Sequence, residues 1–254
     1  MDATHLLAGL ARSSFPRSAA YDPVWLLDNM MGPCSVWLTE ALALQLTLAP
    51  GSRVVDLGCG KAMSSIFLAR EFGVQVTAVD LWVGAQDNQQ RINAAGLTDL
   101  VRPVHADAKS LELSPASFDA VVSIDAFHYF AGEPGGVEAL TRLVRPGGQI
   151  GIVVPGLRDD NGWPDHLAAH WQDGFSTFHG PAWWETLLSR EQTIRVDRVT
   201  TVRWGGSDDW ICWADTCDEW ARFNGREPYE LEAQMLRDDA AGSLLFVMVT
   251  ATKL

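Results

Sequence analysis

The segment from Val54 to Asp80 constrains the fold more than any other part of the chain. It contains an apolar run, the glycine turn Asp56-Leu57-Gly58-Cys59-Gly60, a predicted helix over residues 62–72, and a second apolar run that ends on Asp80. A strand, a glycine turn, a helix and a strand in this order favour a parallel α/β sheet. Glycines in such a turn let the backbone approach a ligand, and an acid after the second strand accepts hydrogen bonds from ribose hydroxyls. The unit therefore predicts a site for a nucleoside-containing cofactor.

The spacing of the glycines argues against a dinucleotide as that cofactor. The dinucleotide fingerprint places a third glycine three residues after the second, at position 63, where this chain has Met63. An NAD-dependent oxidoreductase is thus the alternative by motif, and binding of NADH without binding of a smaller nucleoside would favour it.

Three later blocks complete a pattern that resembles the class I S-adenosylmethionine (SAM) methyltransferases. They are His105-Ala106-Asp107-Ala108, the buried strand expected from Phe118 to Asp125, and Arg142 to Gly148 followed by the apolar run 150–154. Together with the Asp-x-Gly-x-Gly turn they stand in the order and spacing of that family over residues 53–154. The resemblance implies a Rossmann-like α/β fold with a seven-stranded sheet whose last strand is antiparallel. It also implies SAM as the cofactor.

The resemblance carries over to individual positions around the cofactor. Gly58 and Gly60 form the turn, Asp80 accepts from the ribose hydroxyls, and Asp107 accepts from the adenine amino group, its alternative role being a helix N-cap. The chain's expected cofactor-binding residues are Asp56, Gly58, Cys59, Gly60, Ser64, Asp80, Leu81, Trp82, Asp107, Ala108, Asp125, Tyr21 and Met31.

The residues after the fourth strand are the candidates for chemistry. In-line methyl transfer needs a nucleophile that is held and aligned, so positioning alone can supply much of the rate. Where the nucleophile carries a proton, a base helps, and His128 is the first candidate because a histidine on a strand-end turn titrates near neutrality. Asp125 and Tyr129 are the other catalytic candidates. A structural role for His128 in the turn remains the alternative.

The N-terminal 50 residues are expected to form a helical lid on a SAM-binding domain at 51–254. The piece from Tyr21 to Pro33 resembles the gating segment of the cyclopropane-fatty-acid-synthase-like and ubiquinone-methylase-like branches, which implies contacts from Tyr21, Trp25 and Met31 at the sulfonium end. The alternative is that these residues staple the N-terminal helix to the domain.

Tryptophan divides the chain into two parts. Eight of its 11 tryptophans follow residue 155, in inserts expected at about 155–185 and 205–240: Trp163, Trp171, Trp183, Trp184, Trp204, Trp210, Trp213 and Trp220. Such a Trp-rich cap over the ligand edge of the sheet favours an aromatic natural product or an amine as the methyl acceptor, with one or two rings facing it.

Charge and composition exclude several other classes of partner. The formal net charge of −13 argues against binding nucleic acid or an anionic membrane. Between residues 203 and 241 there are ten acids and four arginines, which disfavours a phospholipid acceptor. The four cysteines show no zinc spacing, so no metal is expected. No signal peptide or apolar stretch of about 20 residues is visible, which predicts a cytoplasmic protein without a membrane span. Homo-oligomer formation stays open.

The sequence leaves two other uses of SAM open. One is an enzyme that transfers or cyclises the aminocarboxypropyl arm of SAM, and the other is a non-catalytic SAM-binding protein. Release of S-adenosylhomocysteine would indicate methyl transfer, whereas release of methylthioadenosine would indicate the first alternative.

Overall fold

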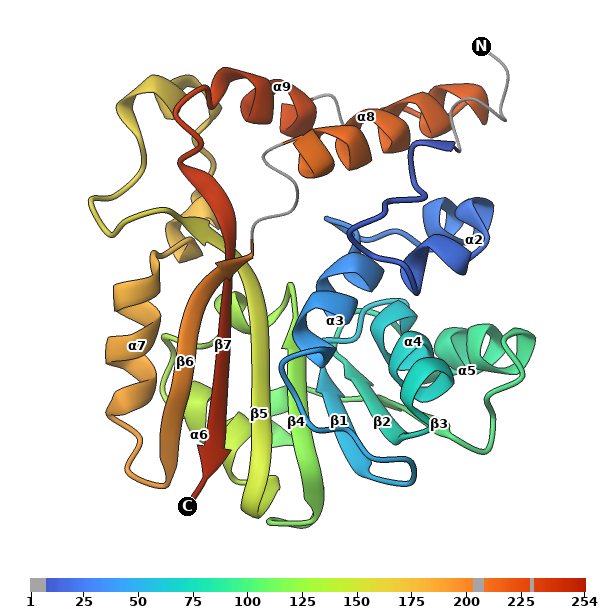
Figure 1. Cartoon of the computed structure of the whole chain (residues 1–254), viewed down its shortest axis with the longest axis vertical. Helices are drawn as coiled ribbons and strands as arrows, with labels where there is room; N and C mark the ends of the chain where they lie inside the picture. Colours follow the sequence, from blue (N-terminus) through green and yellow to red (C-terminus); the bar gives the residue numbers. More distant parts are fainter. Residues whose placement is uncertain (1–7, 203–207, 229–230) are drawn as a thin grey trace.

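A computed structural model describes residues 8–202, 208–228 and 231–254, whose strands form a seven-stranded sheet (Figure 1). The strand order is β3-β2-β1-β4-β5-β7-β6. Neighbours from β3 to β5 pair in parallel, and β7 is antiparallel to both β5 and β6. The predicted sheet with an antiparallel last strand is thereby confirmed. The strands are β1 Arg53–Leu57, β2 Gln75–Asp80, β3 Val101–His105, β4 Phe118–Ile124, β5 Val144–Leu157, β6 Ile194–Val202 and β7 Leu244–Lys253.

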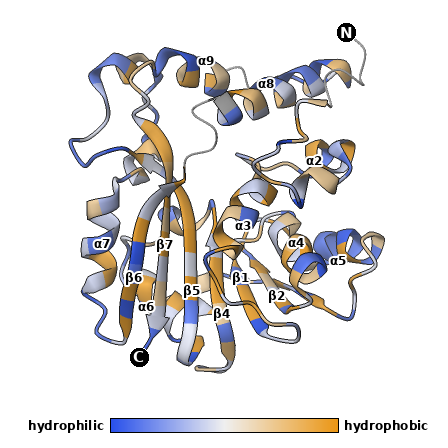
Figure 2. Ribbon diagram, in the orientation of Figure 1, coloured by the Kyte–Doolittle hydropathy of each residue, from blue (hydrophilic) through white to orange (hydrophobic). Residues whose placement is uncertain are grey.

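Helices cover both faces of the sheet, which explains why its central strands are apolar without alternation (Figure 2). Val54 packs into the core on the side of α3, α4 and α5, and its neighbour Val55 packs into the core on the side of α6 and α7. These helices are α3 Ser35–Ala43, α4 Met63–Phe72, α5 Ala85–Ala94, α6 Gly136–Thr141 and α7 Pro181–Ser189. Helix α5 begins directly after Gly84, which is its N-cap.

The chain order places a switch point beside β1. After β1 the chain moves outward to β2 and β3, and it then crosses back to β4 on the other side of β1. In open α/β sheets, ligands bind in the crevice at the carboxyl ends of the strands where the order reverses in this way. The turn after β1 and the turn after β4 flank that crevice.

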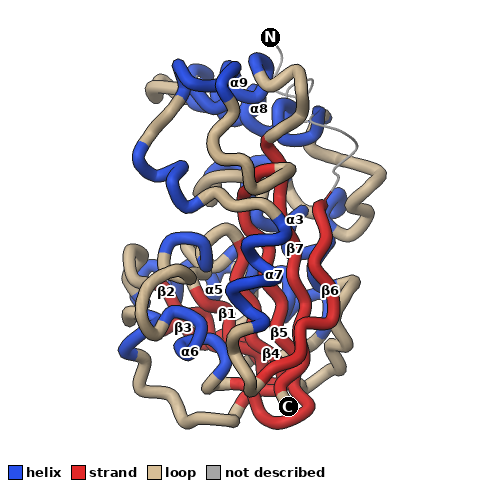
Figure 3. Tube along the Cα trace, turned by 90° about the vertical axis from the view of Figure 1, so that its left-hand side faces the viewer, coloured by secondary structure: helices blue, strands red, loops and turns tan. Residues whose placement is uncertain are grey.

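Helical segments from near both ends of the sequence and from the loops after β3, β4 and β5 lie beyond the carboxyl ends of the strands. Figure 3 shows α8 and α9 there, and Figure 1 shows α2 as well. The Trp213 indole N–H donates to the Gly32 carbonyl at 3.0 Å, and the Trp220 indole N–H donates to Asp28 Oδ1 at 3.1 Å. Residues 28–32 are thus bonded to α8, which is far away in the sequence. The segments are η1 Ser18–Ala20, α2 Pro23–Asp28, η2 Ala108–Ser110, η3 Phe127–Tyr129, η4 Asp165–His170, η5 Asp173–Thr177, α8 Asp208–Phe223 and α9 Leu231–Asp238.

The late part of the chain was the least predictable. Helix α9 and the short helices η4 and η5 were not expected. Residues 155–181, which contain η4 and η5, show no clean periodicity, whereas the apolar residues of α9 at helical spacing were not recognised. Among the late tryptophans, Trp184 and Trp213 are fully buried and Trp171 is 45% exposed, whereas Trp204 lies outside the described residues. Residues 203–207 and 229–230 of the acidic stretch lie outside them as well. No helix in the described ranges is long and apolar enough to cross a bilayer.

Candidate active site

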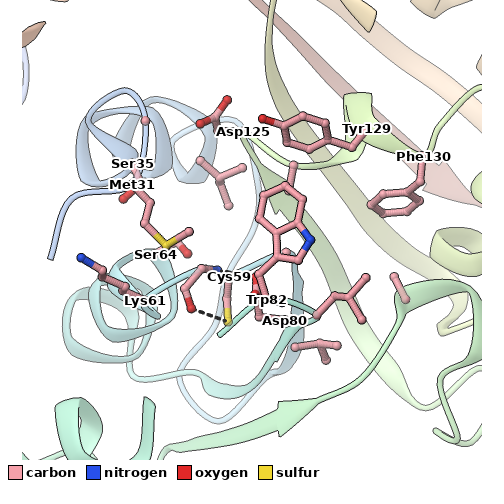
Figure 4. Close-up of a pocket in the computed structure, with 18 of the residues that line it drawn as sticks. Met31, Ser35, Cys59, Lys61, Ser64, Asp80, Trp82, Asp125, Tyr129 and Phe130 are labelled. Atoms are coloured by element: carbon pink, nitrogen blue, oxygen red, sulfur yellow. Dashed lines mark hydrogen bonds between the residues drawn. The ribbon is translucent and has the colours of Figure 1, made fainter. Parts of the chain in front are cut away.

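A cavity of about 350 Å³ lies at the carboxyl ends of β1 to β4 (Figure 4). Its lining comes from the glycine turn, the residues after β2, β3 and β4, and the N-terminal residues between Asn29 and Ser35. This size falls within the range of about 300 to 1,000 Å³ that small-molecule sites occupy. The cavity occupies the switch point described above.

The glycine turn forms the floor of the cavity and tolerates no side chain at its first glycine. Gly58 has a φ of +76°, and an added Cβ would lie 2.2 Å from the Cβ of Ala126. The amides of Gly58 and Cys59 donate to the Val79 carbonyl at 2.8 and 3.0 Å, so the turn is bonded to β2. At Gly60 an added Cβ would lie 3.2 Å from the Met31 sulfur. The turn therefore brings bare backbone to the cavity, with Met31 directly above it.

Asp80 ties this turn to the loop after β2. Its Oδ2 accepts from the Gly60 amide at 2.8 Å, and its Oδ1 accepts from the amides of Trp82 and Val83, each at 2.8 Å. An ionised carboxylate offers roughly four acceptor positions, so three are occupied and about one remains. Asp80 can therefore accept one ligand hydroxyl without giving up these bonds.

The residues after β2 and β3 form the opposite wall. Leu81, Trp82, Asp107 and Ala108 all line the cavity. Asp107 also caps η2, where its Oδ1 accepts from the Lys109 amide at 2.8 Å. One of its two carboxylate oxygens therefore has the N-cap role that was the alternative. Trp82 is 68% exposed and meets the Tyr129 ring edge to face, with 5.4 Å between centroids. This wall has the flat apolar surfaces and the acceptor that a purine ring requires.

Asp56 lies beneath the turn and outside the cavity lining. It is fully buried, and its Oδ2 accepts from the hydroxyls of Ser64 and Ser65 at 2.6 Å each. Burial raises its pKa to about 6, although the two serine hydrogen bonds act in the opposite direction. The Ser64 hydroxyl, which was expected to face the cofactor, is engaged here, while other atoms of Ser64 line the cavity. Asp56 thus orients the start of α4, one of the two roles considered for it.

Asp125 enters the cavity from the end of β4. Its amide donates to the Val153 carbonyl at 2.8 Å, and its φ of +53° then turns the chain sharply. The carboxylate lines the cavity, and Gly32 approaches so closely that an added Cβ there would lie 2.6 Å from Oδ2. Burial raises the pKa of Asp125 well above its ordinary value, and the charge of Glu232 on α9 raises it further.

His128 differs from the sequence expectation. It is only 5% exposed, its ring packs against Tyr129 and Phe178, and it does not line the cavity. Burial lowers its pKa to about 3, so the imidazole stays neutral and the expected titration near neutrality is wrong. Tyr129, the next residue, does line the cavity, and its pKa is raised by burial and by Asp125.

The two N-terminal candidates for cofactor contact, Met31 and Tyr21, lie in different places in the structure. Met31 lines the cavity, but Tyr21 does not. The Tyr21 hydroxyl donates to Glu71 at 3.1 Å, and its ring packs against Trp25 and Phe67. This arrangement fits the stapling alternative for Tyr21, because α4 and the N-terminal helix are joined there.

Several lining residues escaped sequence reasoning, among them Lys61. Its half-buried ammonium donates to the carbonyls of Met30 and Asp28 at 3.2 and 3.4 Å, and burial lowers its pKa. Lys61 directly follows the glycine turn, but no spacing rule tied it to residues 28–30. None of the described late tryptophans lines the cavity, so the expectation of one or two such rings facing the acceptor is not met there. Most of these tryptophans pack in the protein interior, and some donate hydrogen bonds to the N-terminal segment.

Comparison with known proteins identifies the part of the chain that carries this site. Residues 54–148 match the family model described as methyltransferase domain. This domain belongs to the class I SAM-dependent methyltransferase family. It includes the glycine turn, Asp80, Asp107 and Asp125, whereas the N-terminal segment and α8 lie outside the matched residues.

Two curated relatives align with just under half of the chain. Methyltransferase GfsG of Streptomyces halstedii is 31% identical over 48% of this chain, and 27-O-demethylrifamycin SV methyltransferase of Amycolatopsis mediterranei (strain S699) is 31% identical over 45%. The aligned parts span 46% and 43% of those proteins, so less than half of each is compared.

A solved structure extends the likeness to the fold of most of the chain. The putative sarcosine dimethylglycine methyltransferase from Galdieria sulphuraria matches 87% of this chain and 85% of its own, with a TM-score of 0.67 and 20% identity. At that identity the match establishes the shared architecture around the methyltransferase domain.

Proposed function

We propose that this chain binds SAM in the cavity and transfers its methyl group to a small-molecule acceptor. The observation that carries the proposal is the glycine turn bonded through Gly60 to Asp80 at the switch point of a domain that matches the methyltransferase family. A bare backbone floor beside a carboxylate is the arrangement that a nucleoside with a flexible charged arm requires.

The lining residues fit the parts of SAM. Asp80 has an acceptor position for a ribose hydroxyl, and Asp107 stands beside the wall of Leu81 and Trp82 for adenine. The floor at Gly58, where a Cβ would collide with Ala126, leaves room for the amino acid arm. A side chain on that floor would fill the space.

The protein's part in the reaction is positioning and the exclusion of water. When bound, SAM supplies a methyl group on a positively charged sulfur, which a nucleophile displaces in line. Met31 lies over Gly60, and residues 28–32 are held there by Lys61 and by the two indoles of α8. We propose that residues 1–50 act as the lid of a SAM-binding domain formed by residues 51–254, and that closing it excludes water from the reacting atoms.

The class of acceptor is the finer part of the proposal. One relative carries a rifamycin in its name and the structural neighbour carries sarcosine, so likeness alone does not choose between an aromatic natural product and an amine. We propose an acceptor from one of these two classes, handled by a cytoplasmic protein.

Calorimetry and product analysis test this function. The protein is expected to bind SAM and not NADH, and to release S-adenosylhomocysteine with at least one member of a panel of amines, phenols, thiols and acids. Methylthioadenosine as the product would replace methyl transfer by transfer of the aminocarboxypropyl arm. Tight SAM binding without turnover of any panel member would favour a non-catalytic binding protein, and binding of NADH alone would reject the proposal.

A further inference from the structure

The strand order arranges the acidic side chains of the cavity along one line. Asp107 follows β3, Asp80 follows β2, the glycine turn follows β1, and Asp125 follows β4, which is the order of the strands in the sheet. With the nucleoside on β3 and β2 and the charged arm over β1, as proposed above, Asp125 stands at the far end. That end is the acceptor side of the cavity.

The Asp125 carboxylate lacks a partner on the protein. Among the described residues, none donates a hydrogen bond to it or forms an ion pair with it, although its surroundings are mostly protein. A carboxylate removed from water is costly unless donors or a cation compensate its charge. Asp125 lines the cavity with its Oδ2 beside Gly32, so a ligand is the group that can supply the compensation.

The protein adds negative charge at this end. Glu232 on α9 acts electrostatically on Asp125, and Asp218 on α8 acts in turn on Glu232. Glu232 accepts the Trp210 indole N–H at 2.6 Å. Burial raises the pKa of both Asp125 and Glu232, so a bound cation is what stabilises their ionised forms. Two acids from different elements therefore interact at this end of the site, which favours a positively charged ligand.

The two described lysines that line the cavity are occupied elsewhere. Lys109 pairs with Glu133 on the far wall, and Lys61 donates to the carbonyls of Asp28 and Met30. Neither pairs with Asp125.

Tyr129 supplies a second feature that suits a cation. Its hydroxyl points toward Asp125 across the cavity, and its ring is 48% exposed (Figure 4). An aromatic face attracts an ammonium group through the negative potential of the ring. A neutral hydroxyl group could donate a hydrogen bond to the carboxylate, but it brings no charge to compensate the acids and gains no cation–π attraction.

We propose that the acceptor is an amine whose nitrogen is held by Asp125, with Tyr129 as the aromatic wall and Glu232 strengthening the negative potential. This inference rests on the proposed function and narrows it to N-methylation. The bound ammonium group first gives a proton to Asp125, because only the neutral nitrogen has a lone pair for the attack. A nitrogen–carbon bond then forms to the methyl group while the carbon–sulfur bond breaks and its electron pair stays on sulfur. The proton on Asp125 passes to water, so charge and atoms balance.

Binding, rather than turnover, gives the decisive test. Protein loaded with S-adenosylhomocysteine is titrated calorimetrically with two matched pairs, phenethylamine against 2-phenylethanol and ethanolamine against ethylene glycol. The wild type is expected to bind at least one amine ten or more times more tightly than its alcohol. Asp125→Asn is expected to remove that preference, and Glu232→Gln to reduce it about threefold. Asp173→Asn, a change of the same charge at an exposed residue of η5, keeps it.

Other results overturn the inference in distinguishable ways. Equal binding of amine and alcohol by the wild type, or an unchanged preference in Asp125→Asn with native melting behaviour, rejects an amine site at Asp125. If Asp125→Asn instead weakens SAM binding tenfold and leaves the preference intact, Asp125 holds the ammonium group of SAM, and methyl transfer stands without this inference. If the wild type binds no SAM, the proposed function fails and the inference fails with it.

Discussion

The two ends of the cavity are built in different ways. At the nucleoside end, the floor and the acid come from one continuous stretch, and backbone amides of Gly60, Trp82 and Val83 fix the Asp80 carboxylate. At the acceptor end, Asp125 meets Gly32 from the N-terminal segment and the charge of Glu232 from α9. The nucleoside end is formed by residues close together in the sequence, and three amides hold its carboxylate. The acceptor end is assembled from distant segments, and its carboxylate, that of Asp125, has no partner among the described residues.

This difference assigns separate tasks to the two ends. The Asp80 carboxylate, with three of about four acceptor positions taken by amides, holds the two loops together and has about one position left for a ligand hydroxyl. A carboxylate without a protein partner must find one in the ligand. The nucleoside end is therefore expected to define what all reactions of this chain share, and the acceptor end to define which molecule is methylated.

The largest expected effect is at the floor of the nucleoside end. Gly58→Ala places a Cβ 2.2 Å from that of Ala126 and forces an L side chain to a φ of +76°. We expect SAM binding to fall by more than about 100-fold, measured by calorimetry. Gly51→Ala is the control, because Gly51 has a φ of +81° with no atom within 4 Å of the added Cβ. It should cost about 1 to 2 kcal/mol of stability and leave SAM affinity near the wild-type value. Equal SAM affinities in the two variants would show that SAM does not contact the backbone at Gly58.

The next effect concerns the acid of that end. Asp80→Ala deletes the acceptor of three amides and of the proposed ribose contact, so SAM affinity should fall by roughly 10- to 100-fold, as expected for bonds of about 1.5 to 3 kcal/mol to a charged group. Asp87→Ala, an exposed acid in the first turn of α5, serves as the control. Unchanged SAM affinity in Asp80→Ala would show that the nucleoside does not lie over β2.

A pH experiment addresses the support under the floor. Asp56 has its pKa raised from 3.8 to about 6 in the folded protein, so folding favours its protonated form. The free energy of unfolding of the wild type should therefore fall as pH rises from about 3 to about 7, by about 3 kcal/mol relative to Asp56→Asn, whose amide does not titrate. Denaturant unfolding of both proteins at several pH values measures the difference. Parallel pH profiles would contradict the assignment.

The smallest expected effect separates His128 from the acceptor end. His128→Phe keeps an aromatic ring beside Tyr129 and Phe178 and removes a ring nitrogen that has no partner in the described structure. We expect kcat with an accepted amine to change less than about twofold. A loss of tenfold or more, together with loss of one limb of the pH–rate profile, would make His128 the base after all and would weaken the case for Asp125.

Sequence reasoning could find the nucleoside end because its signals are local. Gly58, Gly60 and Asp80 lie within one strand–turn–helix–strand unit, and their spacing follows from the length of the helix between them. The same is true of Asp107, which follows the next strand. The sheet with an antiparallel last strand was expected from the resemblance to the methyltransferases, because apolar runs separated by helical lengths do not by themselves set the order of the strands.

For the acceptor end, the sequence indicated candidate residues but not which of them lie together. Asp125 was recognised by its place after β4, but its relation to Glu232 depends on how α9 packs over the sheet. His128 looked accessible because the ring that covers one side of it, Phe178, comes fifty residues later in the chain. Tyr21 looked like a ligand contact for the same reason, since its partner Glu71 lies at the end of a helix on the core domain.

The bonds from Trp213 and Trp220 to residues 28–32 also imply an order of events during synthesis. Strands β1 to β5, and with them the floor of the cavity, are complete well before α8 leaves the ribosome. Domains fold from the N-terminal side while the chain is still being made. The N-terminal segment, although it is translated first, therefore waits for one of the last helices before it is secured over the site. The cavity floor therefore forms early, and the N-terminal segment that covers it is hydrogen-bonded in place late.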